Sequence, residues 1–157
     1  MHAFRHISYD FVLKYLSTFS TCSAVTADMK TVSLNAVVLA LSTPTVLNFE
    51  DLFNAPVVQS TLRTEKSFDL LKIFLDGTLS DYRNFLNKND GILKALKLDD
   101  FVDILEHKIK LLSICSLCTS ANKSGRSDVT YEELSRCVDC PLDQVEAWVI
   151  DGMFFYI

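Results

Sequence analysis

Two cysteine pairs come nearest to a chemical site in this sequence. Cys115 and Cys118 form one Cys-x-x-Cys pair, Cys137 and Cys140 form another, and eighteen residues separate the pairs. Four thiolates at such spacing can bind zinc tetrahedrally. Zinc-binding pairs, however, usually lie on tight turns, often with glycine, and neither pair here contains a glycine. A small zinc or thiol enzyme is therefore one hypothesis, and structural cysteines are the other.

The sequence around the first pair favours a structural role. Its apolar neighbours are Leu111, Leu112, Ile114 and Leu117. They place the pair in the middle of an apolar helix, where free cysteine is a common small core residue. Neither pair follows a strand and opens a helix, which disfavours a thioredoxin-like role. We therefore predict buried, reduced thiols, no bound metal and no cofactor.

Other catalytic patterns are missing from the sequence. The three histidines are His2, His6 and His107. They are too scattered to suggest a catalytic triad, and we expect His107 on the solvated edge of a helix. Asp99, Asp100 and Asp103 are typical of a helix start, where acidic groups favour the helix dipole. With no nucleotide-binding or metalloprotease motif either, we predict that the protein is not an enzyme.

Composition indicates a globular chain with one good core or two small ones. Of the 157 residues, 49% are hydrophobic and 22% are charged, and the net charge is −5. A net negative charge repels phosphate, which disfavours a large phosphate-binding surface on this chain. Residues 31–49 are uncharged, but Pro44 interrupts them and their continuous apolar part is only 36–41, too short to span a membrane. Charged residues interrupt the N-terminal region, so we expect no signal peptide and a cytoplasmic location.

Apolar residues recur at helical spacing along most of the chain, and glycine and proline are scarce. We predict a mostly α fold, with stacked, solenoid-like helical hairpins over residues 1–120 and a truncated winged-helix subdomain over 121–157. A long helix should run from Asp99 to about Thr119. Residues 121–128 form the one clear linker.

The last thirty residues predict the front half of a winged helix. Thr130 and Glu133 have the spacing of a capping box, Pro141 suits the first turn of a second helix, and Gly152 suits its end. The expected core of this unit is Leu134, Val138, Leu142, Val145, Trp148 and Val149.

An apolar strand is expected to follow at the end of the chain. Its residues, which are our candidates for protein interaction, are Met153, Phe154, Phe155, Tyr156 and Ile157. A single strand leaves its backbone unpaired and recruits another chain. We therefore expect the chain to be part of a larger protein, and to self-associate when isolated.

Stacked hairpins, one long helix and a winged helix in this order resemble the PCI domain. This domain is shared by the proteasome lid, the signalosome and eukaryotic translation initiation factor 3. Residues 143–151 resemble its recognition-position helix, and residues 68–74 with 79–82 resemble one of its helical hairpins. Residues 11–16 and 39–41 are similar to the corresponding family segments in residue type and spacing. The similarity spans nearly the whole chain, in collinear order.

The resemblance implies a scaffold subunit without catalysis. Its partners would be other PCI-type subunits of a large complex, with indirect association with the ribosome and mRNA. Among the subunits of these complexes, the segments named above most resemble a subunit of translation initiation factor 3. That complex acts in the initiation of protein synthesis. A signalosome subunit, acting in the regulation of protein deneddylation, is the alternative. The chain departs from the family in its short upstream repeats and in the lack of a final wing strand and C-terminal helix.

Winged helices also bind DNA, which gives a further alternative of another class. The helix that would enter the major groove, residues 142–151, carries Asp143, Glu146 and Asp151 and no lysine or arginine. Such a helix repels phosphate. We therefore predict no sequence-specific DNA binding.

Overall fold

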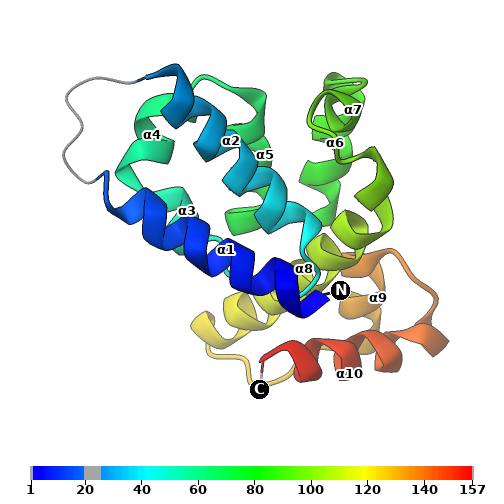
Figure 1. The fold of residues 1–157 in the computed structure, drawn as a ribbon. Helices are drawn as coiled ribbons and strands as arrows, with labels where there is room; N and C mark the ends of the chain where they lie inside the picture. Colours follow the sequence, from blue (N-terminus) through cyan, green and yellow to red (C-terminus); the bar gives the residue numbers. More distant parts are fainter. Residues whose placement is uncertain (1, 20–25, 157) are drawn as a thin grey trace.

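The computed structural model describes residues 2–19 and 26–156, and the side chains of 9–19 and 26–153. Within these ranges every regular element is a helix, which confirms the mostly α prediction (Figure 1). In chain order the α-helices are α1 (His2–Ser17), α2 (Ala27–Ser42), α3 (Glu50–Asn54), α4 (Pro56–Leu62), α5 (Lys66–Asp76), α6 (Leu79–Lys88), α7 (Ile92–Ala95), α8 (Val102–Lys123), α9 (Tyr131–Val138) and α10 (Val145–Tyr156). Two 3₁₀ turns, η1 (Asp99–Phe101) and η2 (Leu142–Gln144), precede α8 and α10.

The predicted C-terminal strand is wrong for the residues that the structure describes. Helix α10 continues through Gly152 as far as Tyr156, and Ile157 lies outside the described residues. The strand prediction rested on the β-propensity of five apolar residues, which is a weak local preference. A helix satisfies its backbone hydrogen bonds within the segment, whereas a lone strand needs a partner. Gly152 therefore does not end the helix as expected.

Helix α2 lies at the centre of the larger core and contacts α1, α4, α5 and α8. Small residues on it, among them Ala36 and Ala40, are fully buried and allow neighbouring helices to approach. The aromatic ring of Phe74 lies edge-on to Phe49 and Tyr82, with ring centroids 5.8 and 5.7 Å away. This core extends from Tyr9 to Ile109.

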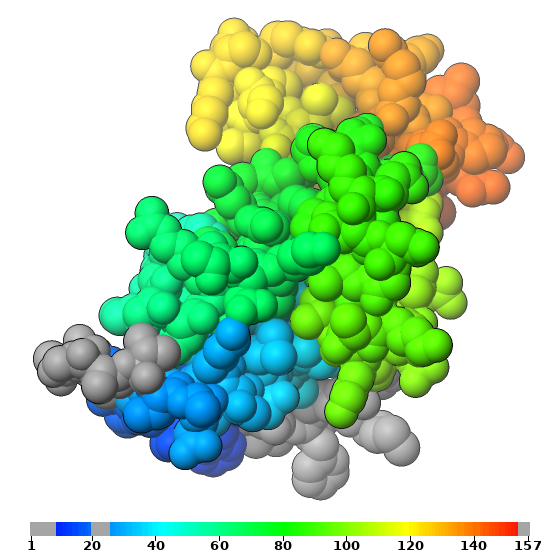
Figure 2. Space-filling view, turned by 90° about the horizontal axis from the view of Figure 1, so that it is seen from above, coloured from blue at the N-terminus to red at the C-terminus, as the bar shows by residue number. Residues whose placement is uncertain are grey.

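A second, smaller core joins the end of α8 to the C-terminal helices. Ile114 of α8 packs with Leu134 and Val138 of α9 and with Val145 of α10. Figure 2 shows the end of α8 and α9, in yellow and orange, as a lobe at one end of the molecule, with α1 and α2 in blue at the other end. Helix α8 is 22 residues long and contributes to both cores. It continues to Lys123, so the expected boundary at residue 120 falls inside a helix.

One buried lysine ties α8 to the end of α2. The Lys108 side chain is 1% exposed. Its Nζ donates to the carbonyl oxygens of Ala40 at 2.7 Å and Leu41 at 3.2 Å, and lies 5.1 Å from the centre of the Phe49 ring. The last carbonyl groups of a helix have no partner within it, so Lys108 supplies donors that α2 lacks at its C-terminus.

None of the helices in the described ranges combines the length and the apolar character needed to cross a bilayer.

Candidate assembly surface

The linker and the start of α9 are fixed by a network of polar groups. The Thr130 hydroxyl accepts from the Glu133 N–H at 3.2 Å, and the Glu133 carboxylate accepts from the Thr130 N–H at 2.9 Å, which completes the expected capping box. Arg126 donates to both oxygens of the same carboxylate at 2.9 Å. These bonds, with Arg126 first, lower the pKa of Glu133 to about 2. The linker is thereby held against α9.

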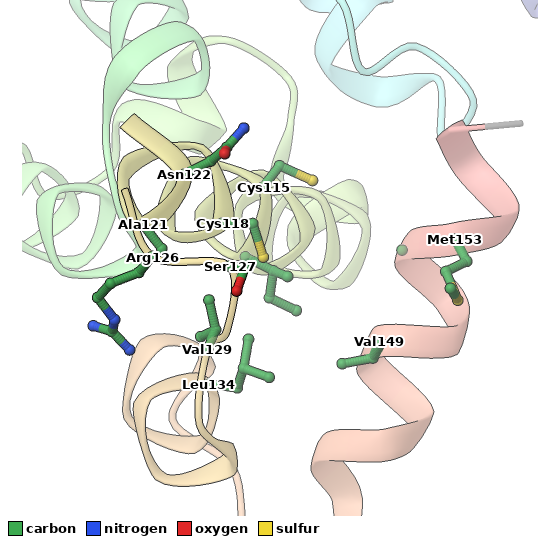
Figure 3. Close-up of a pocket in the computed structure, with 12 residues that line it drawn as sticks. Cys115, Cys118, Ala121, Asn122, Arg126, Ser127, Val129, Leu134, Val149 and Met153 are labelled. Atoms are coloured by element: carbon green, nitrogen blue, oxygen red, sulfur yellow. The ribbon is translucent and has the colours of Figure 1, made fainter. Parts of the chain in front are cut away.

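An apolar groove of about 610 Å³ lies between α8, the linker and α10. Figure 3 shows Cys115, Cys118 and Asn122 on one side, with Val149 and Met153 of α10 facing them across the gap. Its lining also includes Ile114, Ala121, Arg126, Ser127, Val129, Leu134 and Gly152. Met153 is 63% exposed, so an apolar wall of the groove is open to solvent. An exposed apolar surface of this kind is typical of a contact with another segment.

The linker beside the groove presents unpaired backbone. Residues 126–130 belong to no helix, and Ser127 and Val129 line the groove. Among the hydrogen bonds of the described residues, the main-chain N–H groups of Ser127, Asp128 and Val129 donate to no acceptor, while their neighbours Arg126 and Thr130 do donate. A short exposed edge next to an apolar groove can accept an extended segment.

The cysteines lie beside this groove rather than in a buried core. Cys118 is exposed, and Cys115, Cys137 and Cys140 are half-buried, which corrects the expectation that they are buried. Burial raises the pKa of the Cys118 and Cys137 thiols, and a neighbouring thiol raises each further. Over the described part of the chain, no three His, Cys, Asp or Glu side chains are placed to hold a metal ion. Raised thiol pKa values also disfavour a nucleophilic role.

Trp148 lies at the junction between the C-terminal lobe and the rest of α8. Its ring centroid is 4.9 Å from that of His107, and the Lys110 ammonium lies 5.2 Å from its centre. Sequence reasoning placed His107 on a solvated edge and missed this contact. Periodicity in the sequence could not predict this contact, because His107 and Trp148 lie on different helices and are 41 positions apart.

Ion pairs extend the same junction to α6. Arg83 binds Asp139 at 2.7 Å and lies 3.6 Å from Glu106, which in turn pairs with Lys110 at 3.2 Å. Asp139 ends α9 in the left-handed conformation, with φ of 52°. These half-exposed pairs contribute little stability individually, but they connect α6, α8 and α9. The lobe is therefore held by a polar junction as well as by its own small core.

The residues expected in the lobe's core occupy three different environments. Leu134, Val138 and Val145 are buried, and Trp148 and Val149 are half-buried against them. Leu142 is 52% exposed instead, because it lies in η2 before the regular turns of α10 begin. Of the interaction candidates, Met153 lines the groove; the side chains of Phe154, Phe155, Tyr156 and Ile157 lie outside the described residues.

No protein-family model matches the chain. Curated relatives do match it, over nearly its whole length.

The chain is similar to subunit M of eukaryotic translation initiation factor 3. The proteins of that name from Phaeosphaeria nodorum and Chaetomium globosum are each 30% identical to it, over 145 and 148 residues. The protein from Pyricularia oryzae is 29% identical over 148 residues. Each match covers 92% of this chain but only 32–34% of the relative. The chain thus spans about a third of the length of these subunit M proteins.

Proposed function

We propose that the chain acts as a non-catalytic scaffold subunit of the eukaryotic translation initiation factor 3 complex, in the initiation of protein synthesis. The observation that carries the proposal is the similarity to subunit M over 92% of the chain. The helical fold with an open apolar groove is consistent with a protein that works through contacts.

The proposal includes the PCI-type organisation expected from the sequence. Residues 1–120 would form the helical-repeat part, and residues 121–157 the C-terminal unit. The neighbours would be other PCI-type subunits of the complex in the cytoplasm, with the ribosome and mRNA contacted indirectly. The packing of α9 and α10 against the end of α8 would hold the C-terminal unit in a fixed orientation for these contacts.

In this proposal, the groove and the unpaired linker edge would be the contact surface for assembly. An extended segment of a neighbouring subunit would pair with the N–H groups of Ser127 and Val129 and place apolar side chains against Leu134, Val149 and Met153. Main-chain hydrogen bonds would supply affinity and the groove would supply specificity.

Affinity purification of the tagged chain from fungal cells, followed by mass spectrometry, tests the proposal. We expect subunits of translation initiation factor 3 to be enriched. The variant Met153→Asp should weaken this recovery, because it places a charge in the groove. Ile150→Asp is the matched control: Ile150 is 45% exposed on the same helix and does not line the groove.

Two results would contradict the proposal. Recovery of signalosome subunits in place of initiation factor subunits would assign the chain to the alternative complex. Equal recovery by the wild type and by Met153→Asp would show that the groove is not the contact.

A further inference from the structure

Sulfur-containing side chains line both walls of the apolar groove. Cys115 and Cys118 lie about one helical turn apart on α8, and Met153 faces them from α10 (Figure 3). The chain has five cysteines and three methionines, and three of these eight side chains are among the described residues that line this groove. Met153 is 63% exposed although its side chain is apolar. A segment that enters the groove would therefore meet sulfur on both sides.

The groove offers no free charge to a partner. Among the described residues that line it, Arg126 is the only charged one, and both terminal nitrogens of its guanidinium donate to the Glu133 carboxylate. Burial and the neighbouring Cys115 raise the pKa of the Cys118 thiol, which therefore stays neutral at pH 7. A charged side chain placed here would lose its hydration without gaining a partner. The complementary segment is therefore uncharged inside the groove.

Sulfur favours aromatic rings among uncharged side chains. A thioether sulfur attracts an aromatic ring at a separation of about 5 Å, often at the edge of the ring. The ring face is negative and can accept the weak S–H donor of a cysteine. An aliphatic side chain lacks this charge distribution and gains only dispersion contacts. Methionine also has three rotatable bonds, so Met153 can adjust to a ring that enters.

The linker edge determines which residues of a partner enter together. The side chains of Ser127 and Val129 line the groove, and that of Asp128 does not. In an extended segment paired with this edge, alternate side chains point to the same side of the segment, about 7 Å apart. Two partner side chains separated by one residue would therefore enter the groove together.

We propose that the groove binds an extended, uncharged partner segment in which an aromatic and an apolar residue are separated by one residue, with the aromatic ring between Cys118 and Met153. The apolar residue would lie against Val129 and Leu134. The inference rests on the function proposed above, because it specifies the chemistry of the segment that fills the same groove. It gives the exposed thiol a role as a neutral contact group.

Nuclear magnetic resonance titration of the ¹⁵N-labelled chain, under reducing conditions, tests the preference for an aromatic ring. The probes are acetyl-Thr-Phe-Thr-Val-Thr-amide and the same peptide with cyclohexylalanine in place of phenylalanine. Both should cause saturable shifts of the amide signals of residues 115–118 and 149–153. The phenylalanine peptide should bind about fivefold more tightly, because only its ring is aromatic. The saturated ring is at least as apolar, so burial alone predicts the opposite order.

Two variants and a control locate the contact. Met153→Leu conserves volume and apolar character but removes the sulfur. It should weaken binding of the phenylalanine peptide about threefold and leave binding of the cyclohexylalanine peptide unchanged. Cys118→Ala should also reduce the preference for the phenylalanine peptide. Ser116→Ala is the control, because Ser116 is exposed on the same helix and does not line the groove; both affinities should stay unchanged.

Three results would overturn this inference. They are equal or tighter binding of the cyclohexylalanine peptide, the absence of saturable shifts at millimolar peptide, and a dimer that Met153→Asp converts to a monomer in sedimentation analysis. The last result would show that a second copy of the chain fills the groove.

The proposed function is tested separately by recovery of initiation factor subunits. Enrichment of those subunits without a preference for the aromatic peptide would refute this inference alone. An intact preference without enrichment would refute only the assignment to that complex.

Discussion

Replacing Lys108 by methionine should remove a large part of the pH dependence of stability. Burial lowers the pKa of Lys108 from 10.5 to about 7. In the unfolded chain the ammonium is solvated and keeps its ordinary pKa. Between pH 7 and 10.5 the unfolded state therefore binds one more proton at this position than the folded state. Stability must rise with pH across this window, and must be insensitive to this group below pH 7.

The magnitude follows from the size of the shift. Each pH unit inside the window adds about 1.4 kcal/mol to the free energy of unfolding. Between pH 7 and pH 9 the wild type should therefore gain up to about 2.7 kcal/mol from Lys108. The carbonyl groups of Ala40 and Leu41 and the ring of Phe49 favour the ammonium form, and limit the gain to about 2 kcal/mol.

Urea unfolding followed by circular dichroism at pH 7, 8 and 9 measures this difference. The wild type should gain about 2 kcal/mol over this range relative to Lys108→Met, in which the titrating group is absent. Lys110→Met is the matched control, because Lys110 lies on the same helix and pairs with Glu106 near the surface. Its stability should follow the wild-type pH dependence. Parallel pH dependence in the wild type and Lys108→Met would refute the reasoning, and would mean that Lys108 titrates normally in the folded state.

Three further predictions concern the C-terminal lobe. Trp148→Ala should lower the free energy of unfolding by about 2 kcal/mol, since the ring is half-buried against the lobe's core and His107; a loss below about 0.5 kcal/mol in urea unfolding would contradict its role at the junction. Because the folded-state pKa of Glu133 is lowered from 4.5 to about 2, its stabilising effect should be present above pH 4.5 and disappear as pH falls toward 2. Thermal unfolding between pH 2 and 6 should show a weaker acid dependence for Glu133→Gln than for the wild type. The chain should contain no stoichiometric zinc, and a chelator should leave its circular dichroism unchanged; one zinc per chain with unfolding on chelation would refute this.

Patterns among neighbouring residues were sufficient to predict the helical character of the fold and the cap of α9. Apolar spacing predicted the helices because burial of one face dominates their stability. Thr130 and Glu133 predicted the start of α9 because both partners of a capping box lie within four residues. Thr78 caps α6 in the same way, and Asp81 is the second partner of its capping box.

The acidic character of η2 and α10 also followed from sequence. Asp143, Glu146 and Asp151 are exposed, as their charge requires. These carboxylates disfavour contact with phosphate groups in the folded lobe.

Only the tertiary structure decided which residues meet across the fold. Lys108 looks like a surface lysine in sequence, and it is buried because α2 ends against α8 and needs donors there. Tyr9 and Asp51 line the same small pocket, although about forty residues separate them in the sequence. Residues 153–156 have the propensity of a strand and form a helix, because strand formation depends on a partner that the segment itself does not supply. Helix periodicity and caps are properties of neighbouring residues, whereas burial, junctions and pockets depend on contacts between distant ones.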